Sequence, residues 1–240
     1  GLKRKDIKRM PEIRNLSEKG NERKGFFEAK EFARLLEHLP EDLHDFCRFA
    51  YLTGWRKSEI ASLSWSDIEG DVVRLRGENS KNGEPRSVVL TGELAEVIKR
   101  RTQLRLSSGV LTDSVFHREG DAIAEFRKSW ASACVAAGLG AMTCPKCGEA
   151  RKQGDPARCA KCKKQRVYTG RIFHDFRRTA VRNMIRSGVQ QHIAMKISGH
   201  KTAAMFRRYD IASEGDLREA MVRVESYNKS QQQRVVSIAQ

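Results

Sequence analysis

Residues 174–189 read HDFRRTAVRNMIRSGV, and this amphipathic stretch decides the fold. Its spacing predicts a helix that runs to Arg186 and ends at Gly188. His174 and Arg177 are one turn apart and share a face of that helix. A helix N-terminus attracts phosphate through its free N–H groups and its dipole. The pair therefore indicates a phosphate site, and a plain N-terminal cap is the alternative that explains one residue but not both.

A second stretch, TGWRKSEIASLSWSDI at residues 53–68, places Arg56 just after a glycine turn at the start of a helix. Glu59 follows three residues later, so both side chains lie on one helical face. A buried acid can hold an arginine rigid while its guanidinium group binds a phosphate through two hydrogen bonds. The alternative is an ordinary Arg–Glu pair on a helix surface, which is common.

A third stretch, SKNGEPRSVVL at residues 80–90, carries Lys81 beside Asn-Gly, a strong hairpin signal between strand-like segments. The flanking residues 72–75 and 88–90 are rich in Val and Leu, which predicts two antiparallel strands. A lysine at the tip of such a turn can reach into a groove. Lysines at turns more often only keep the turn soluble, so this signal is weak by itself.

The fourth stretch, SGHKTAAMFRRYD at residues 198–210, contains His200 and, nine residues later, Tyr209. A tyrosine near a helix end is usually half-buried packing. Its hydroxyl pKa of about 10 also makes it a poor nucleophile at neutral pH. It becomes competent only among cations that favour the charged oxygen and neutralise a phosphate. The other three stretches supply such cations.

Along the rest of the chain, the spacing of apolar residues predicts a fold that is mainly α with a small antiparallel β-sheet. Helical spacing that begins at Phe26 ends at Pro40. Residues 141–168 break the pattern with Cys, Lys, Gly and Pro. Further helices are expected over residues 41–54, 57–63, 92–106, 123–137, 174–186, 190–197, 202–209 and 214–227.

The charge balance points to a polyanionic partner. The 240 residues contain 46 Lys and Arg against 30 Asp and Glu, a formal net charge of +16. Such a field attracts nucleic acid, whose binding releases counterions. An acidic membrane surface or an acidic protein would fit the charge alone. The sequence shows no secretory signal and no apolar run near the roughly 20 residues of a membrane span, so no membrane association is expected.

Four of the six cysteines form two CxxC pairs, Cys144 with Cys147 and Cys159 with Cys162. In a chain without a secretion signal this spacing predicts a structural zinc site, with four thiolates and no open position. The segment is basic, so the site is either a zinc ribbon that touches DNA or a staple for an extended loop. The staple is slightly favoured because zinc with four thiolates carries about two negative charges. The remaining Cys47 and Cys134 resemble buried small apolar residues.

Together the four quoted stretches resemble the tyrosine recombinase (phage integrase) family over roughly residues 25–227. The joint order and spacing carry this resemblance, since no single stretch is decisive. It implies the tyrosine recombinase catalytic-domain fold, of the DNA breaking-rejoining enzyme type. The catalytic set it implies consists of Arg56, its supporting acid Glu59, the hairpin Lys81, His174 and Arg177 of the HxxR box, the late His200, and the nucleophile Tyr209.

The chemistry that this resemblance implies uses no nucleotide and no catalytic metal. Tyr209 attacks a phosphodiester and leaves a 3′-phosphotyrosyl link, while Arg56 and Arg177 neutralise charge on the phosphate. Lys81 protonates the leaving 5′-oxygen, and the two histidines assist. The partners implied are double-stranded DNA and further copies of the chain, with a homo-oligomer of four protomers on two duplexes and the segment after Tyr209 docked on a neighbour.

The expected domain organisation has a basic linker or arm over residues 1–24, a catalytic domain over 25–227 and a polar C-terminal tail over 228–240. The zinc-ribbon-like insert over 141–168 is unusual for the family. The first 24 residues are too few for the helical domain that usually precedes the catalytic one, so a fragment is expected. The arm is either a solvated leader or a strap along DNA.

Three functions remain open at this level. The leading one is a site-specific DNA recombinase or integrase, cytoplasmic and encoded by a prokaryote, phage or mobile element. A type IB topoisomerase-like enzyme would use the same chemistry to relax DNA. A non-enzymatic zinc-ribbon DNA-binding protein on a decayed recombinase scaffold is the third, and the intact catalytic set argues against decay.

Overall fold

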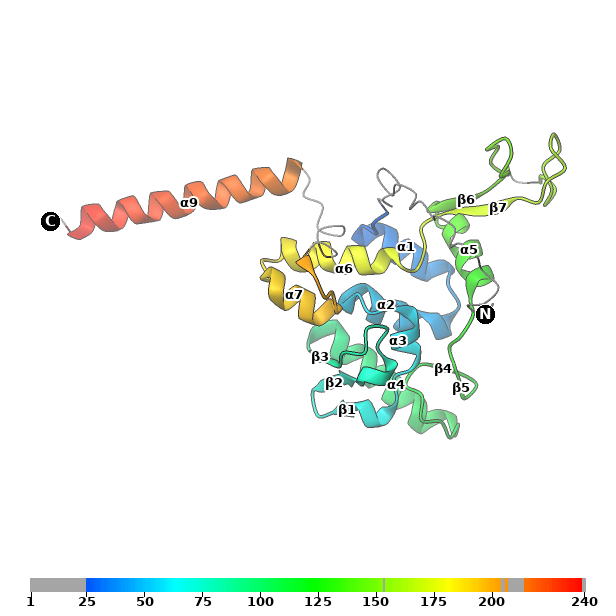
Figure 1. The fold of residues 1–240 in the computed structure, drawn as a ribbon, viewed down its shortest axis with the longest axis horizontal. Coiled ribbons are helices and arrows are strands. Elements are labelled where there is room, and N and C mark those ends of the chain that lie inside the picture. The colour runs from blue at the N-terminus through cyan, green and yellow to red at the C-terminus, as the bar shows by residue number, and fades with distance from the viewer. Residues whose placement is uncertain (1–24, 153, 204–205, 207–213, 239–240) are drawn as a thin grey trace, which may run out of the picture.

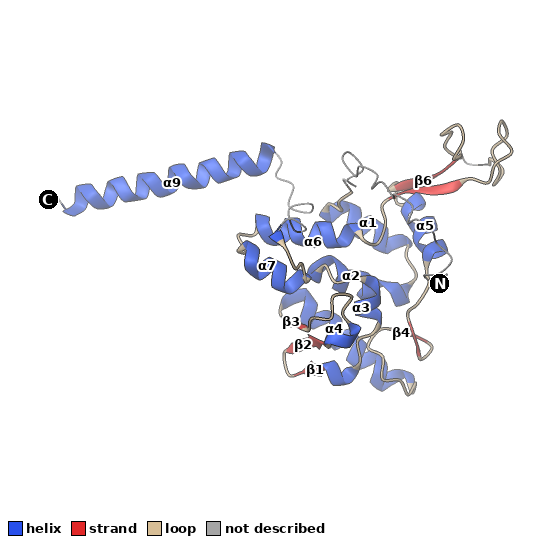
Figure 2. Ribbon diagram, viewed as in Figure 1, coloured by secondary structure: helices blue, strands red, loops and turns tan. Residues whose placement is uncertain are grey.

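The computed structural model describes residues 25–152, 154–203, 206 and 214–238 (Figure 1). Helices dominate and the strands are short, as Figure 2 shows. The helices are α1 (Ala29–His38), α2 (His44–Thr53), α3 (Lys57–Ala61), α4 (Gly92–Ser108), α5 (Arg127–Ala136), α6 (Asp175–Arg186), α7 (Gln191–Ser198) and α9 (Glu214–Ile238). Short 3-10 helices cover Glu41–Leu43, Trp65–Asp67 and Gly77–Asn79. The mainly α fold with small antiparallel sheets is thus confirmed.

The part of the chain that the structure describes contains three separate antiparallel sheets, where the sequence predicted one. The first contains β1 (Ile68–Glu69), β2 (Val72–Leu75) and β3 (Arg86–Val89), in the order β1-β2-β3. The hairpin from β2 to β3 is present, but its connection is longer than the Asn-Gly turn alone. The other sheets are two-stranded and pair β4 (His117–Arg118) with β5 (Asp121–Ala122), and β6 (Gly140–Thr143) with β7 (Val167–Gly170).

Helix α6 lies at the centre of the molecule, against α2 and among the other helices (Figure 1). Its residues from Asp175 to Arg182 are all buried. The Phe176 ring lies 4.6 Å from that of Phe27, 5.4 Å from that of Trp130 and 5.3 Å from that of Phe173. Edge-on and tilted ring contacts of this kind add to the free energy that apolar burial itself provides. The DFRR stretch, residues 175–178, is therefore fixed in the core rather than on the surface.

The expected start of the helix over residues 123–137 is wrong by four residues. Helix α5 begins at Arg127, because Ile123 and Phe126 are buried in an extended segment after β5. The Glu125 carboxylate then accepts hydrogen bonds from the N–H groups of Phe126 and Arg127, at 3.0 and 2.9 Å. A side-chain acceptor at this point satisfies the first free donors of a helix and fixes where it starts.

Two further segments differ from the expectation. Strands β6 and β7 frame the cysteine-rich insert, with Ala141 opposite Thr169 and Met142 opposite Tyr168. Each strand has only four residues, so neither gives a clear alternating pattern in the sequence. Helix α9 continues through most of the expected polar tail to Ile238, since the tail contains no Gly or Pro to stop it.

Some expectations fall on residues that the structure does not describe. The arm over residues 1–24 lies outside the described residues, as does most of the expected helix over 202–209. Tyr209 lies outside them as well. Among the described residues, no helix combines the length and the apolar character that crossing a membrane requires.

Gly54 joins α2 to α3 in a left-handed conformation, with φ at +69°. A Cβ atom at this position would lie 3.1 Å from the Cβ of Ala180 in α6. We predict that Gly54→Ala lowers the free energy of unfolding by about 1–3 kcal/mol, from backbone strain together with displaced packing. Denaturant unfolding measures the change.

Gly70 provides the control, because its φ is +59° and no atom lies within 4 Å of an added Cβ. Gly70→Ala should show the backbone cost alone, near the lower end of that range. Equal losses in the two variants would contradict the contribution of the Gly54–Ala180 contact.

Candidate active site

The C-terminal end of α7 is where the candidate residues meet. Gly199 ends the helix in the left-handed conformation, with φ at +71°. The indole N–H of Trp55 donates to the Ile197 carbonyl at 2.8 Å. The side-chain amide of Asn82 donates to the Gly199 carbonyl at 3.3 Å, from the loop between β2 and β3. Both contacts satisfy carbonyls that have no partner within the helix.

Arg177 of α6 makes the central contacts with this helix end. Its Nη1 donates to the carbonyls of Ser198 and Gly54, the latter at 2.8 Å, and its Nη2 donates to the Gly199 carbonyl at 3.2 Å. The side chain is buried, with the residue 2% exposed. A buried cation is well placed here, because the C-terminal ends of α7 and α2 both present negatively polarised carbonyls. One guanidinium group therefore joins α6, α7 and the turn before α3.

His200 is held between Arg177 and Ser198. The Arg177 Nε–H donates to His200 Nε2 at 3.2 Å, so Nε2 acts as an acceptor. Nδ1 lies 2.7 Å from the Ser198 hydroxyl oxygen, which itself donates to the Ala194 carbonyl. His200 Nδ1–H must then be the donor to Ser198. Burial, followed by the charges of Arg177 and Arg56, lowers the pKa of His200 to about 3, so the ring is neutral.

Arg56 and Glu59 form the pair that the sequence predicts. Arg56 precedes α3, and its Nη1 lies 2.7 Å from Glu59 Oε1. The Arg56 backbone N–H also donates to Glu59 Oε2 at 2.7 Å. The Glu59 side chain is fully buried, whereas that of Arg56 is 15% exposed. Glu59 thus fixes Arg56 while leaving part of its guanidinium group open to solvent.

Arg86 of β3 is a member of this cluster that the sequence reasoning missed. Its guanidinium group contacts Glu59, packs over the Trp55 ring at 5.2 Å from the centroid, and is 6% exposed. Burial raises the pKa of Glu59, but hydrogen bonds from the Arg56 N–H and the charge of Arg86 outweigh it, so the net pKa lies below the usual value. The sequence signal that could have identified Arg86 was its place at an inward-facing position of the hairpin, five residues after Lys81.

His174 directly precedes α6 and, taken as a whole residue, is exposed at the edge of the cluster. The protein surrounding the ring, and then the charges of Arg177 and Arg56, lower the pKa of His174 below its ordinary value. The neighbouring Asp175 is buried, and its carboxylate accepts the N–H of Ile172 at 2.9 Å. Asp175 therefore fixes the turn into α6 on which His174 lies.

Lys81 is exposed in a turn that the Gly83 N–H closes on the Ser80 carbonyl at 3.0 Å. The Asn82 contact with Gly199 ties this turn to the end of α7. A cleft of about 440 Å³ separates the loop from α7, with Asn82, Arg86, Lys196 and His200 in its lining. The loop that carries Lys81 is therefore anchored beside the arginine cluster.

The structure thus brings five of the expected residues to one region: Arg56, Glu59, His174, Arg177 and His200. Lys81 lies on the anchored loop next to them. Tyr209 is not among the described residues. Two arginines with neutral histidines and a lysine nearby form a site with the charge to stabilise a phosphate dianion or a developing negative charge.

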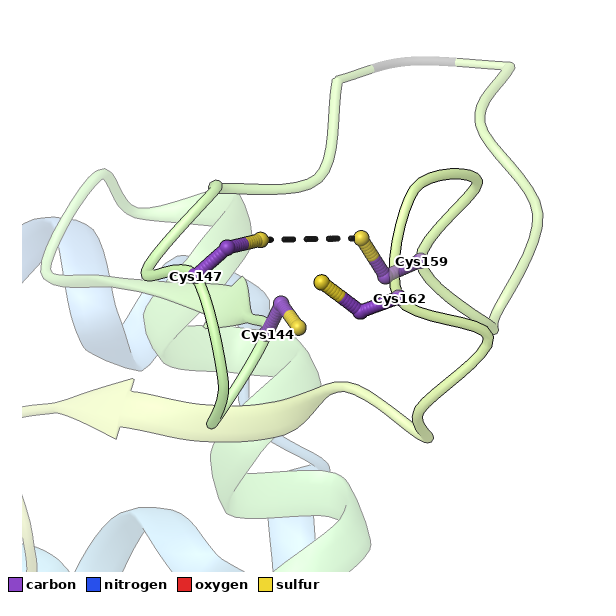
Figure 3. A group of neighbouring side chains, drawn as sticks. All are labelled: Cys144, Cys147, Cys159 and Cys162. Atoms are coloured by element: carbon purple, nitrogen blue, oxygen red, sulfur yellow. Dashed lines mark hydrogen bonds between the residues drawn. The ribbon is translucent and has the colours of Figure 1, made fainter.

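The four predicted cysteines form a second group beyond β6 and β7, where their sulfur atoms lie within 4.8 Å of one another (Figure 3). Cys147 Sγ and Cys159 Sγ are 3.7 Å apart. The edge of a tetrahedron with a metal–sulfur distance near 2.3 Å is about 3.8 Å. This group can therefore hold a metal ion. Cys47 and Cys134, in contrast, are buried in the core, in agreement with the expectation.

The two cysteine loops have the same backbone pattern. In the first, the Cys144 N–H donates to the Glu149 carbonyl and the Gly148 N–H to the Cys144 carbonyl, at 3.0 and 2.9 Å. In the second, the Cys159 N–H donates to the Lys164 carbonyl and the Lys163 N–H to the Cys159 carbonyl, at 2.9 and 2.8 Å. Gly148 and Lys163 hold the equivalent left-handed position. Each loop thus presents its two thiols on one side, which a bound metal requires.

A family model described as the phage integrase family matches residues 26–215. An integrase of Salmonella phage P22 is 25% identical over 209 residues, which cover 86% of this chain and 48% of that protein. The chain thus spans about half the length of that relative.

Two solved structures have a similar fold. A XerA recombinase matches with a TM-score of 0.58 and 18% identity, over 82% of this chain and 64% of that one. A lambda integrase dimer bound to a COC′ core site matches with a TM-score of 0.56 and 16% identity, over 78% of this chain and 59% of that one.

The pKa of His200 leads to a prediction about acid stability. The folded protein keeps His200 neutral down to about pH 3, whereas the unfolded chain binds a proton near the ordinary pKa of 6.5. The contribution of His200 to the free energy of unfolding is therefore fully present above pH 6.5. It decreases as the pH falls from 6.5 toward 3, by at most about 1.4 kcal/mol per pH unit. Denaturant unfolding at a series of pH values measures this slope.

His200→Gln is the matched variant, because an amide supplies a donor and an acceptor but does not titrate. We expect this variant to be less stable at pH 7 but to lose less stability between pH 6.5 and pH 4 than the parent protein does. Parallel pH profiles for the two proteins would contradict the neutral, buried His200.

Proposed function

The chain belongs to the phage integrase family, and on that premise we propose that it is a site-specific DNA recombinase that cleaves and rejoins DNA through a 3′-phosphotyrosyl intermediate. The observation that carries the proposal is the meeting of Arg56, Arg177, His174 and His200 at the end of α7. Its relatives are named integrase and recombinase, which favours strand exchange over topoisomerase-like relaxation.

The two arginines neutralise the scissile phosphate. Arg56 is the more open of the two, with 15% of its side chain exposed, and Glu59 holds its other face. Arg177 is buried and bound to carbonyls, so in this conformation its charge acts on the phosphate from the buried side of the site. Fixed charges in a partly desolvated site stabilise the developing negative charge without reorganising during the reaction.

The covalent steps use three further residues. The Tyr209 oxygen attacks the phosphorus atom, its proton passes to the neutral His174, and the bond to the 5′-oxygen breaks. Lys81 supplies the proton that this leaving oxygen takes up. The 5′-hydroxyl of a partner strand then attacks the phosphotyrosyl link and gives its proton to Lys81. The bond to the Tyr209 oxygen breaks, and His174 returns the proton to this oxygen. The neutral His200 accepts a hydrogen bond from Arg177 and so holds this arginine in place.

Double-stranded DNA is the proposed partner, because a chain of net charge +16 attracts it strongly.

We also propose self-association through α9, which extends away from the rest of the structure (Figure 1). Leu217, Met221 and Val224 recur at helical spacing on α9 and are 61, 66 and 49% exposed. Such an apolar stripe fits docking on a neighbouring protomer, and the matched lambda integrase is a dimer on its core site. Four protomers on two duplexes remain the proposed assembly.

Zinc is the proposed metal for Cys144, Cys147, Cys159 and Cys162. Thiolate donors in two CxxC loops are the ligands zinc prefers in structural sites, and the 3.7 Å separation of Cys147 and Cys159 fits a tetrahedron around it. With four protein ligands there is no position for a reacting water, so the metal's contribution when bound is to hold the two loops together.

The phage relative also favours a cytoplasmic protein of phage or mobile-element origin.

The recombinase proposal predicts a covalent adduct. A duplex from the flanking DNA of the source element, nicked near the cleavage point, should trap the protein on the DNA because the short cleaved strand diffuses away. We expect Tyr209→Phe to form no adduct and Arg56→Ala to form it on the order of 10²-fold more slowly. Gel analysis of the protein–DNA adduct measures both.

Tyr51→Phe is the control, since the Tyr51 ring stacks on Phe32 at 4.1 Å and belongs neither to the arginine cluster nor to α9. It should form the adduct as the parent protein does. An adduct in Tyr209→Phe, or none in the parent protein with its cognate site, would refute the proposed mechanism. Recombinant products from two sites distinguish a recombinase from a topoisomerase-like enzyme.

The zinc proposal predicts about one zinc ion per chain in protein purified without chelators, as elemental analysis measures. Cys147→Ser should lose the metal, because it removes one of the four thiolates. Cys134→Ser, in the core, should keep it at the parent level. Metal-free protein with disulfides between these cysteines would overturn the assignment.

A further inference from the structure

The loops between β6 and β7, with described residues 144–152 and 154–166, form a projection that we term the cysteine arm. We propose that the cysteine arm is a second DNA-contacting element, which binds the phosphate backbone of the duplex beside the scissile phosphate. This inference rests on the proposed recombinase function, and it goes beyond the role of the four cysteines as a loop staple.

The arm carries more positive charge than its own acids neutralise. Glu149 pairs with Lys161 at 3.1 Å, and Asp155 pairs with Arg166 at 3.5 Å. Arg166 is buried and serves the interior of the arm. Six other cations are exposed and form no ion pair with any described residue, namely Lys146, Arg151, Lys152, Arg158, Lys163 and Lys164.

These six cations also outnumber the charge of the metal centre. Zinc with four thiolates carries about two negative charges, so the arm remains strongly positive when the metal is bound. A loop that only needed stapling would not require this excess, because unpaired like charges repel one another. The charge balance therefore favours a polyanion as the partner over a purely structural role.

The cysteine loops present several of these cations on fixed backbone. Lys146 lies between Cys144 and Cys147 in the sequence, and the Lys164 carbonyl accepts a hydrogen bond from the Cys159 N–H. Lys163 occupies a left-handed position, with φ at +55°, where the equivalent loop has Gly148. A lysine at this position costs backbone strain that a glycine would avoid. Its presence favours a use for the side chain.

The arm is connected to the arginine cluster by a continuous surface. Strand β7 leads directly from the arm through Arg171 to His174, and the arm extends outward beyond α5 (Figure 1). The Arg171 carbonyl accepts hydrogen bonds from the Tyr168 hydroxyl at 2.6 Å and the Trp130 indole at 2.9 Å, which fixes the root of the arm.

A cleft of about 440 Å³ fills the interval between the arm and the arginine cluster. Arg56 and His174 line it beside the arginine cluster, Tyr168 lines it at the root of the arm, and Lys57 adds a further positive charge. Glu125 and Arg127 also line it and pair with each other at 3.3 Å. A DNA backbone bound at Arg56 therefore meets cations as it continues toward the arm. This continuity commits the arm to the same duplex rather than to a separate partner.

Salt-dependent binding tests the inference without knowledge of the target site, because non-specific affinity comes mainly from phosphate contacts. The full chain carrying Tyr209→Phe is titrated with a duplex of random sequence at several salt concentrations. Adding Lys146→Gln, Arg158→Gln and Lys164→Gln should weaken binding at least about tenfold near 0.1 M salt and reduce the salt slope by about 0.9 per lost contact.

The matched control removes three exposed charges from the α4 end of the molecule, through Lys99→Gln, Arg105→Gln and Arg118→Gln. It changes the net charge equally, so it should alter the slope by less than about one. Equal effects of the two triple variants would overturn the inference while leaving the recombinase proposal intact. A parent protein that binds no duplex would instead contradict the recombinase proposal.

Lysine acetylation of the unmodified sequence provides a second measurement that does not depend on the folding of a variant. With the random-sequence duplex present, mass spectrometry should find Lys146, Lys163 and Lys164 at least severalfold protected, and Lys99 unchanged. Protection absent from the arm while Lys81 is protected would refute the arm contact and support the staple. Zinc content, measured on each variant, verifies that the arm retains its metal centre.

Discussion

The hydrogen bonds from Arg177 to the carbonyls of Gly54, Ser198 and Gly199 are the constraint on which the rest of the site depends. One buried cation satisfies the C-terminal ends of α2 and α7 at once, where the peptide dipoles of both helices are negative. Removing it would leave several buried carbonyls without a partner, which is among the larger costs a folded protein can incur. The other site residues take their positions from this junction.

Around the junction, function and structure use the same side chains. His200 accepts a hydrogen bond from Arg177, and Trp55 satisfies the next carbonyl of α7 while supporting Arg86. Glu59 in turn holds Arg56 and Arg86. Substitutions in this cluster therefore change stability and the proposed phosphate site together, and an activity loss alone would not assign a catalytic role to any one of them.

The sequence patterns predicted the parts of the fold that local physics determines. Helix α6, its glycine stop and the pairing of β2 with β3 follow from periodicity and turn residues, and Arg56 with Glu59 follows from helical spacing. Arg86 was missed because its partner, Glu59, lies on a different element, and β6 with β7 because each strand is short. The start of α5 depends on the burial of Phe126, a tertiary effect that no local pattern records.

The junction at Arg177 also determines when the site can exist during folding. The contact of Arg177 with Gly54 joins residues 123 positions apart, and that of Trp55 with Ile197 joins residues 142 apart. Contacts of such long sequence separation form only after the intervening chain has closed a large loop. While Gly199 is still inside the ribosome, the arginines of the nascent chain therefore lack the contacts that position them, and the candidate site forms only when the end of α7 is in place.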